Sequence, residues 1–264
     1  MEYIKVIVLG IVQGLTEFLP VSSSGHLELA KVLMGSTTAL ESKGLLLTLI
    51  LHAATALSTV VVFWKDIKII LHQIFKGDKA GIKFAGFIVI SMIPATVVGL
   101  FFKDSIESLF NGNLLLVGTM LLITAGLLIL ANRKSTHTNS LNARSSFYIG
   151  LMQAFAILPG VSRSGATIAT AIGLGIDRAT AARFSFLMVI PLIFGSMAKS
   201  LMDTDSLELN TSAGLLACGF LSAFVTGIVA CRWMIALVEK SQLQYFAYYC
   251  LTVGIISIGY GIFS

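Results

Sequence analysis

Long apolar stretches follow one another along the chain, and most charged residues stand in the short segments between them. A helix needs about 20 apolar residues to cross the hydrocarbon core of a bilayer. Six stretches come close to that length with little or no charge, so each predicts a membrane-spanning helix. We expect these spans over 45–64, 84–102, 114–131, 184–198, 213–231 and 245–263.

Two further apolar regions, 3–35 and 146–175, are interrupted by segments rich in proline, glycine and serine. The interruptions, over 20–26 and 159–165, break a helix but hold too few polar groups for a surface loop. Broken backbone at membrane depth is tolerated only where it faces protein or a wet cavity. We therefore expect two re-entrant helical hairpins beside the six spans.

A cleaved signal peptide is an alternative interpretation of residues 1–25, because small residues follow an apolar run. Residues 1–5 carry no net positive charge, however, and Gln13, Thr16 and Glu17 interrupt the apolar run. We therefore expect this segment to form the first hairpin.

The composition also indicates an all-α polytopic membrane protein. Of the 264 residues, 56% are hydrophobic and 12% charged, and this excludes an ordinary soluble domain. The net charge of +5 indicates basic loops that orient the protein in the membrane, as expected for cytoplasmic loops rich in lysine and arginine. The chain has no basic cluster with interleaved aromatic residues that would indicate nucleic-acid binding. Cys218, Cys231 and Cys250 lack the spacing of a disulfide framework or a zinc site.

The two interrupted regions belong to an internal repeat. A shift of 140 positions superimposes identical residues, namely Gly10 on Gly150, Gln13 on Gln153, Val21 on Val161, Ser22 on Ser162, Ser24 on Ser164 and Gly25 on Gly165. A shift of 128 superimposes Ala95 on Ala223, Val97 on Val225, Gly99 on Gly227, Thr124 on Thr252 and Gly126 on Gly254. We expect one domain, 1–264, built from repeats over about 1–135 and 140–264, with a loop at 65–83 longer than its counterpart at 199–212.

Each half holds one hairpin and three spans, so the second copy is expected to be inverted relative to the first. Inverted repeats bring their broken helices together near the membrane midplane. Lysine and arginine are abundant in 65–83 and 132–146, which should be cytoplasmic, and not in 103–113 and 199–212, which should be outside. Both termini are then expected outside.

Candidate chemistry gathers at the two interruptions. Gln13 and Glu17 share a helix face, and the polar turn from Ser22 to His26 follows at once. Arg163 stands in the second interruption where a new helix starts, and a helix N-terminus with arginine binds anions. Neighbouring hydroxyls and flexible glycines complete this segment, namely Ser162, Ser164, Thr167, Gly160 and Gly165. A charge at the bilayer centre costs at least ~2.5–3.5 kcal/mol, so Glu17 and Arg163 are functional candidates.

A purely structural interpretation is that Glu17 and Arg163 pair across the repeat interface and hold the halves together. It does not account for the serine run and the histidine beside them. Any single serine here is better interpreted as a packing or capping residue than as a nucleophile, so the argument depends on the whole cluster. His52 lies within a predicted span, and His72 and His137 lie in predicted loops, so we assign these three no role.

These residues carry a resemblance to a known family. The sequence resembles the undecaprenyl-diphosphate phosphatases, integral membrane enzymes of the bacitracin-resistance type. The run over 13–26, QGLTEFLPVSSSGH, is similar to the first signature of this family, and the run over 159–167, PGVSRSGAT, to its second. The length, the span layout and the run ARFSF over 182–186 also fit, so the resemblance covers essentially the whole chain.

The resemblance implies roles for individual residues. Glu17 would act in catalysis or hold Mg²⁺ or Ca²⁺, Ser23 would be the nucleophile, and His26 its acid/base partner, three positions away and near enough for contact across a turn. Arg163, Ser162 and Thr167 would clamp the diphosphate. The remaining substrate-binding candidates are Gln13, Ser22, Ser24, Gly25, Ser164 and Gly165. Gln13 stands where a common form of the motif has glutamate, which puts a two-carboxylate metal site in doubt.

The implied substrate is a C55 polyprenyl diphosphate, converted to the monophosphate carrier of cell-wall assembly in the bacterial inner membrane. The implied access is from the outer side, and a homodimer is one assembly this leaves open. A transporter or flippase for an anionic lipid or small anion is the alternative, since inverted repeats with broken helices are typical of alternating access. Ser23 with His26 distinguishes the two, because a carrier holds an anion without attacking it.

Overall fold

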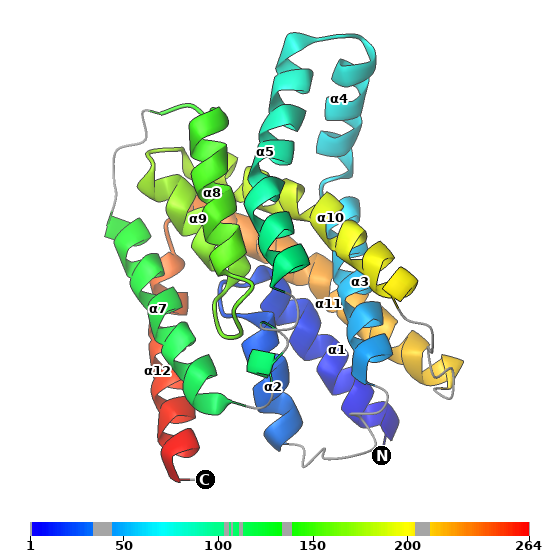
Figure 1. Cartoon of the computed structure of the whole chain (residues 1–264), viewed down its shortest axis with the longest axis vertical. Coiled ribbons are helices and arrows are strands. Elements are labelled where there is room, and N and C mark those ends of the chain that lie inside the picture. Colours follow the sequence, from blue (N-terminus) through cyan, green and yellow to red (C-terminus); the bar gives the residue numbers. More distant parts are fainter. Residues whose placement is uncertain are drawn as a thin grey trace.

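The computed structural model describes residues 2–33, 44–102, 106, 108–110, 113–133, 139–203 and 212–263, which form helices and no strand (Figure 1). The helices are α1 (Glu2–Phe18), α2 (Ser23–Leu33), α3 (Gly44–Val62), α4 (Trp64–Phe75), α5 (Lys79–Phe101), the short 3₁₀ helix η1 (Ser108–Phe110), α7 (Leu114–Arg133), α8 (Ala143–Phe155), α9 (Arg163–Gly173), α10 (Arg178–Asp203), α11 (Ala213–Glu239) and α12 (Leu243–Phe263).

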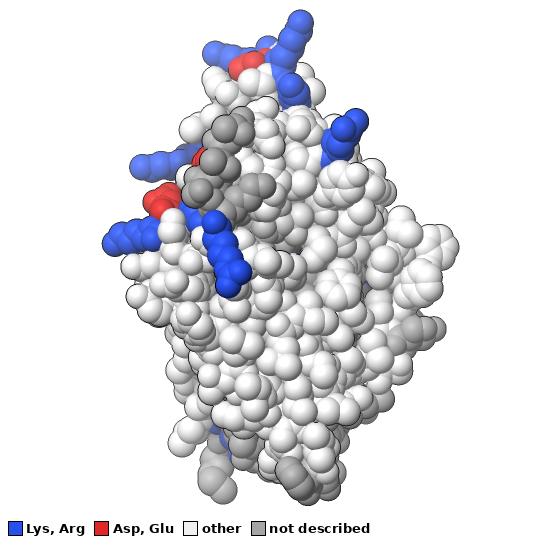
Figure 2. Space-filling model, turned by 90° about the vertical axis from the view of Figure 1, so that its left-hand side faces the viewer, with Lys and Arg blue, Asp and Glu red and all other residues white. Residues whose placement is uncertain are grey.

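The helical architecture and the membrane spans confirm the predicted fold class. Among the described residues, five helices, α5, α7, α10, α11 and α12, are long and apolar enough to cross a membrane, and α3 with α4 forms a sixth candidate bent by 72°. On the face in Figure 2, most visible lysine and arginine side chains lie towards the upper end and leave a wide uncharged surface below. A multi-pass membrane protein presents such a surface to lipid.

The prediction of a loop over 65–83 is wrong. Residues Trp64–Phe75 form α4, and α5 already begins at Lys79, where the Asp78 side chain accepts a hydrogen bond from the backbone N–H of Ala80 (2.9 Å). His72 therefore lies on a helix. The charged residues of this segment suggested a loop. They are interspersed with isoleucines, however, and an amphipathic helix accommodates such a pattern. His137 and much of 103–113, 132–146 and 199–212 lie outside the described residues.

The chain ends bear on the predicted topology. The first turn of α1 and the last turn of α12 lie at the same end of the molecule, and the hairpin of α4 and α5 lies at the opposite end (Figure 1). This agrees with termini on one side of a membrane and the basic 65–83 segment on the other. Which side is cytoplasmic stays a prediction.

Both predicted interruptions break the helix where the sequence indicates. The α1 helix ends at Phe18 and α2 begins at Ser23, while α8 ends at Phe155 and α9 begins at Arg163. The two breaks share one local pattern, in which a serine hydroxyl accepts a hydrogen bond from a glycine three residues later. Ser22 accepts from Gly25 N at 3.3 Å, and Ser162 accepts from Gly165 N at 3.1 Å. That the hairpins re-enter a membrane stays a prediction.

Each broken helix pair packs against the other half of the chain. The α1 helix lies along α11, α8 lies along α5, and α7 lies along α12. Gly10 faces the Gly219 carbonyl oxygen, and Gly150 faces the Ser91 carbonyl oxygen. Ser91 and Gly219 are themselves 128 positions apart (219 − 91), the shift found for the later part of the repeat. These equivalent contacts agree with the duplication, which stays a prediction.

The close packing of α8 on α5 predicts a stability defect. A Cβ atom at Gly150 would lie 2.4 Å from the Ser91 carbonyl oxygen, so Gly150→Ala forces the two helices apart. Overpacking of this kind costs about 1–3 kcal/mol. We expect a lower midpoint of thermal unfolding in detergent. Gly126→Ala is the matched control, since a Cβ there meets no heavy atom within 4 Å. Equal midpoints for both variants would contradict the close approach of α8 to α5.

Candidate active site

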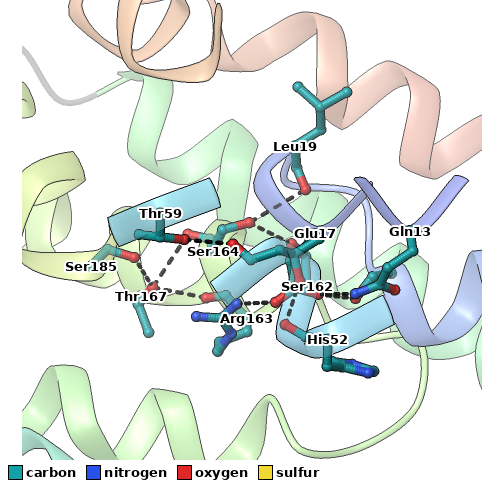
Figure 3. Close-up of polar contacts among 12 residues, drawn as sticks. Gln13, Glu17, Leu19, His52, Thr59, Ser162, Arg163, Ser164, Thr167 and Ser185 are labelled. Atoms are coloured by element: carbon teal, nitrogen blue, oxygen red, sulfur yellow. Dashed lines mark hydrogen bonds and ion pairs between the residues drawn. The ribbon is translucent and has the colours of Figure 1, made fainter. Parts of the chain in front are cut away.

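The site is built around the Glu17 carboxylate, in the last turn of α1 and 8% exposed. Its Oε2 atom accepts hydrogen bonds from Gln13 Nε2 at 3.1 Å and from Ser23 Oγ at 2.7 Å. Its Oε1 atom forms an ion pair with Nη2 of Arg163, the first residue of α9. Figure 3 shows this ion pair and the neighbouring Gln13 amide. The structure thus brings together Gln13, Glu17, Ser23 and Arg163, as the sequence predicts.

The two helix breaks touch each other at this point. Ser164 Oγ on α9 donates to the Leu19 carbonyl oxygen in the first break at 3.3 Å. A Cβ at Gly25 would lie 3.3 Å from Cα of Gly160, and a Cβ at Gly165 would lie 3.1 Å from Cβ of Pro20. The N-termini of α2 and α9 therefore start beside one carboxylate. Both termini bring the partial positive charge of a helix N-terminus, which favours an anion between them.

The second break is held by α7. Gly160 has φ of +95°, and a Cβ there would lie 2.5 Å from the Val117 carbonyl oxygen, so no other residue fits without movement. The Thr124 hydroxyl on α7 accepts a hydrogen bond from Ser162 N at 3.1 Å. These contacts fix the segment that carries Arg163.

The predicted contact between Ser23 and His26 is not formed. The Ser23 hydroxyl donates to Glu17, while the two ring nitrogens of His26 pair with the Ser22 carbonyl oxygen and the Tyr249 hydroxyl. Ser23 is the first residue of α2, and its short side chain reaches back to α1, whereas the imidazole reaches towards α12. The base within hydrogen-bond reach of Ser23 is therefore Glu17.

The other binding candidates lie at the two helix breaks or in the first two turns of α2 and α9. Ser22 and Ser24 form a hydroxyl pair at 3.3 Å, and Ser162 and Ser164 form the equivalent pair at 3.3 Å. The buried Thr167 hydroxyl donates to the Arg163 carbonyl oxygen at 2.8 Å and lies 2.6 Å from Ser185 Oγ on α10. Thr167 thus links α9 to α10 and contacts the backbone of Arg163. A direct part in phosphate binding stays a prediction.

The sequence analysis missed two residues of this neighbourhood. His52 on α3 lies beside the cluster, and its Nδ1 atom lies 2.8 Å from the Thr48 carbonyl oxygen (Figure 3). Tyr249 on α12 contacts His26. A lone histidine and a lone tyrosine within apolar stretches carry no motif, so no local signal indicates which residues they meet.

The donor atoms present fit an ion that is shared with a phosphate. Within the described ranges no three His, Cys, Asp or Glu residues gather as a metal cluster. Glu17 provides a carboxylate, and the buried Oε1 atom of Gln13 has no hydrogen-bond partner within the described part of the chain. Mg²⁺ is commonly held by one or two carboxylates together with substrate phosphate oxygens. This donor set is therefore adequate for such an ion only when the substrate contributes oxygens.

Comparison with known proteins places the chain in a family. Residues 6–256 match the family described as "Bacitracin resistance protein BacA". A relative from Christiangramia forsetii, named undecaprenyl-diphosphatase, is 54% identical over 259 residues, covering 98% of each chain. Proteins of the same name from Parabacteroides distasonis and Bacteroides fragilis are 46% and 44% identical over 263 residues, again covering 98% of each chain. Because the match spans both helix breaks and nearly the whole length, this chain belongs to the bacitracin resistance protein BacA family.

Proposed function

We propose that this chain is an integral membrane phosphatase that hydrolyses undecaprenyl diphosphate, a C55 polyprenyl diphosphate, to undecaprenyl phosphate and inorganic phosphate. One observation carries the proposal. The Ser23 hydroxyl donates a hydrogen bond to a carboxylate whose other oxygen is paired with Arg163. Such a cluster would supply a nucleophile, its base and a phosphate-binding cation together. The names of the relatives supply the class of substrate.

Ser23 and Glu17 would carry out the first chemical step. A serine hydroxyl is a weak nucleophile until a neighbouring base removes its proton. As Ser23 Oγ forms a bond to the terminal phosphorus, its proton passes to Glu17, and the P–O bond to the bridging oxygen breaks. The C55 monophosphate leaves with that oxygen. Water then attacks the phosphoserine, releases inorganic phosphate and restores the hydroxyl.

Arg163 and the two helix N-termini would neutralise the diphosphate. Phosphoryl transfer depends mainly on positioning and on stabilising the charge of the transferred group. A guanidinium that pairs with carboxylate also matches phosphate oxygens. We infer that an arriving diphosphate draws Arg163 away from Glu17 and so frees the carboxylate to act as base. Mg²⁺ or Ca²⁺, held by Glu17 with Gln13 and the substrate, would supply further neutralisation.

The lipid tail of the substrate would explain why such an enzyme is embedded in a membrane. The C55 tail would stay in lipid while the head group reaches the polar cluster between the helices. We propose the bacterial inner membrane, both termini outside and a site open to the outer side, which would return the carrier used in cell-wall assembly. Labelling of cysteines introduced at positions 23 and 163 from each side tests the side of access.

Phosphate release by the wild-type protein tests the proposal. In detergent, the purified protein is expected to release inorganic phosphate from undecaprenyl diphosphate. A chelator should suppress the release, and added Mg²⁺ or Ca²⁺ should restore it. Binding of the lipid without release, at any metal concentration, would favour the transporter alternative. Phosphate release that is insensitive to the chelator would refute the proposed metal ion but not the proposed phosphatase activity.

A further inference from the structure

The contact between His26 and α12 assigns the ring nitrogens of His26. Its Nδ1 atom lies 2.9 Å from the Ser22 carbonyl oxygen, and its Nε2 atom lies 2.7 Å from the Tyr249 hydroxyl. A carbonyl oxygen only accepts hydrogen bonds, so Nδ1 carries the hydrogen. In a neutral imidazole Nε2 then accepts, and the Tyr249 hydroxyl is the donor. In water the opposite tautomer, with hydrogen on Nε2, is the more populated form.

The Tyr249 hydroxyl suits His26 in both charge states. It donates to Nε2 when the imidazole is neutral, and it accepts from Nε2 when the imidazole is protonated, because a phenol does both. The ring can therefore gain or lose a proton without leaving its place. The two rings also stack, with centroids 5.5 Å apart and planes 17° from parallel. Both a polar and an apolar contact thus hold the imidazole.

The α12 helix is anchored at this same break. Cys250 Sγ, next to Tyr249, lies 3.5 Å from the Pro20 carbonyl oxygen. Ser22, whose carbonyl binds His26, has φ of +71°, a conformation that a non-glycine residue keeps only when its surroundings hold it. The second half of the chain therefore braces the turn that carries Ser23 and His26.

We propose that Tyr249 is a positioning residue of this site, which fixes the orientation and the Nδ1–H tautomer of His26 and acts through that imidazole. The role rests on the proposed function and on the acid/base role that the family resemblance implies for His26. It also corrects the expected pairing of the histidine. His26 is held for a proton transfer other than the activation of Ser23, which Glu17 performs.

Tyr249→Phe tests the proposal, because it keeps the ring and removes only the hydroxyl. We expect kcat for phosphate release to fall between about 10- and 100-fold with KM nearly unchanged, since small misplacements of a reacting group have effects of that size. Tyr248→Phe is the matched control on the adjacent, more exposed tyrosine. It should retain wild-type kcat. Equal kcat for Tyr249→Phe and wild type would overturn the proposal.

A double variant shows whether the effect passes through His26. If it does, Tyr249→Phe together with His26→Phe should lose no more activity than His26→Phe alone. Independent, multiplying losses would instead mean that Tyr249 serves packing or another group, and would refute the proposed route.

Nitrogen NMR of histidine-labelled protein reads the tautomer without any activity. The His26 signals, identified by their absence from His26→Phe, should show hydrogen on Nδ1 in the wild type and shift towards the Nε2–H form in Tyr249→Phe. An Nε2–H form in the wild type would overturn the inference. If the wild type releases no phosphate, the proposed function fails, and this measurement alone decides whether Tyr249 sets the state of His26.

Discussion

Ser23→Ala is expected to reduce kcat for phosphate release from undecaprenyl diphosphate by at least about 10³-fold, since loss of a catalytic nucleophile typically has effects of that order or larger. The KM should change little, because Arg163 and the two helix N-termini still bind the head group. The fold should persist, because Glu17 keeps its ion pair with Arg163 and its hydrogen bond from Gln13. Steady-state kinetics in detergent gives both parameters.

The control for this variant is Ser196→Ala. Ser196 is an exposed serine of α10 whose hydroxyl bonds only within its own helix, to the Ile193 carbonyl oxygen at 2.9 Å, among the described residues. Its replacement should leave phosphate release unchanged. A phosphoserine on the peptide that contains Ser23, trapped by acid and found by mass spectrometry, would identify the covalent intermediate directly. Near-normal activity of Ser23→Ala would show that water attacks the substrate directly.

Most of the fold is predictable because membrane burial leaves a strong signal. Spans such as 114–131 and 245–263 are apolar over the required length, and the segments 20–26 and 159–165, rich in proline, glycine and serine, interrupt helices as predicted. The amphipathic helix α4 was predicted as a loop, because lysine-rich segments between apolar stretches are usually loops. The hydropathy pattern also does not record the 72° bend between α3 and α4.

The core of the site is predictable for a different reason. Gln13 and Glu17 meet because helix neighbours four positions apart share a face, and Glu17 and Arg163 meet because buried charges need partners. The contact of His26 was mispredicted because spacing gives proximity along a helix but not the direction of a side chain. Its actual partner, Tyr249, lies 223 positions away and has no motif around it.

The predicted repeat does not extend to the proposed catalytic groups. By the shift of 140, Ser23 corresponds to Arg163 (23 + 140), and Glu17 corresponds to Ile157 (17 + 140). Each half therefore starts a helix at the same point of the site, but one half provides the acid and the hydroxyl while the other provides the guanidinium. Neither half holds all of the proposed catalytic groups, so the proposed reaction requires both breaks to stay in contact.

Arg163→Lys is expected to fold and to lower phosphate release by about 10²–10³-fold, the range seen when one charge-stabilising donor is removed from a transition state. Lysine keeps the positive charge beside Glu17 but replaces the planar fork of arginine by a single point charge. It therefore loses paired contacts to phosphate oxygens while still neutralising the carboxylate. We expect both kcat and the affinity for diphosphate to decrease. Arg163→Ala is a poorer test, since an unpaired buried carboxylate costs about 3–5 kcal/mol of stability.

Arg183→Lys provides the matched comparison. Arg183 on α10 also forms an ion pair, with its Nε atom 2.7 Å from Asp66 Oδ1 on α4, but its side chain is 43% exposed. The same substitution there should leave phosphate release within about twofold of wild type, because partly exposed pairs contribute little. If Arg163→Lys also retained full activity with an unchanged thermal midpoint, Arg163 would serve only to pair with Glu17. The interpretation of this ion pair as a packing device between the two halves would then replace the diphosphate clamp.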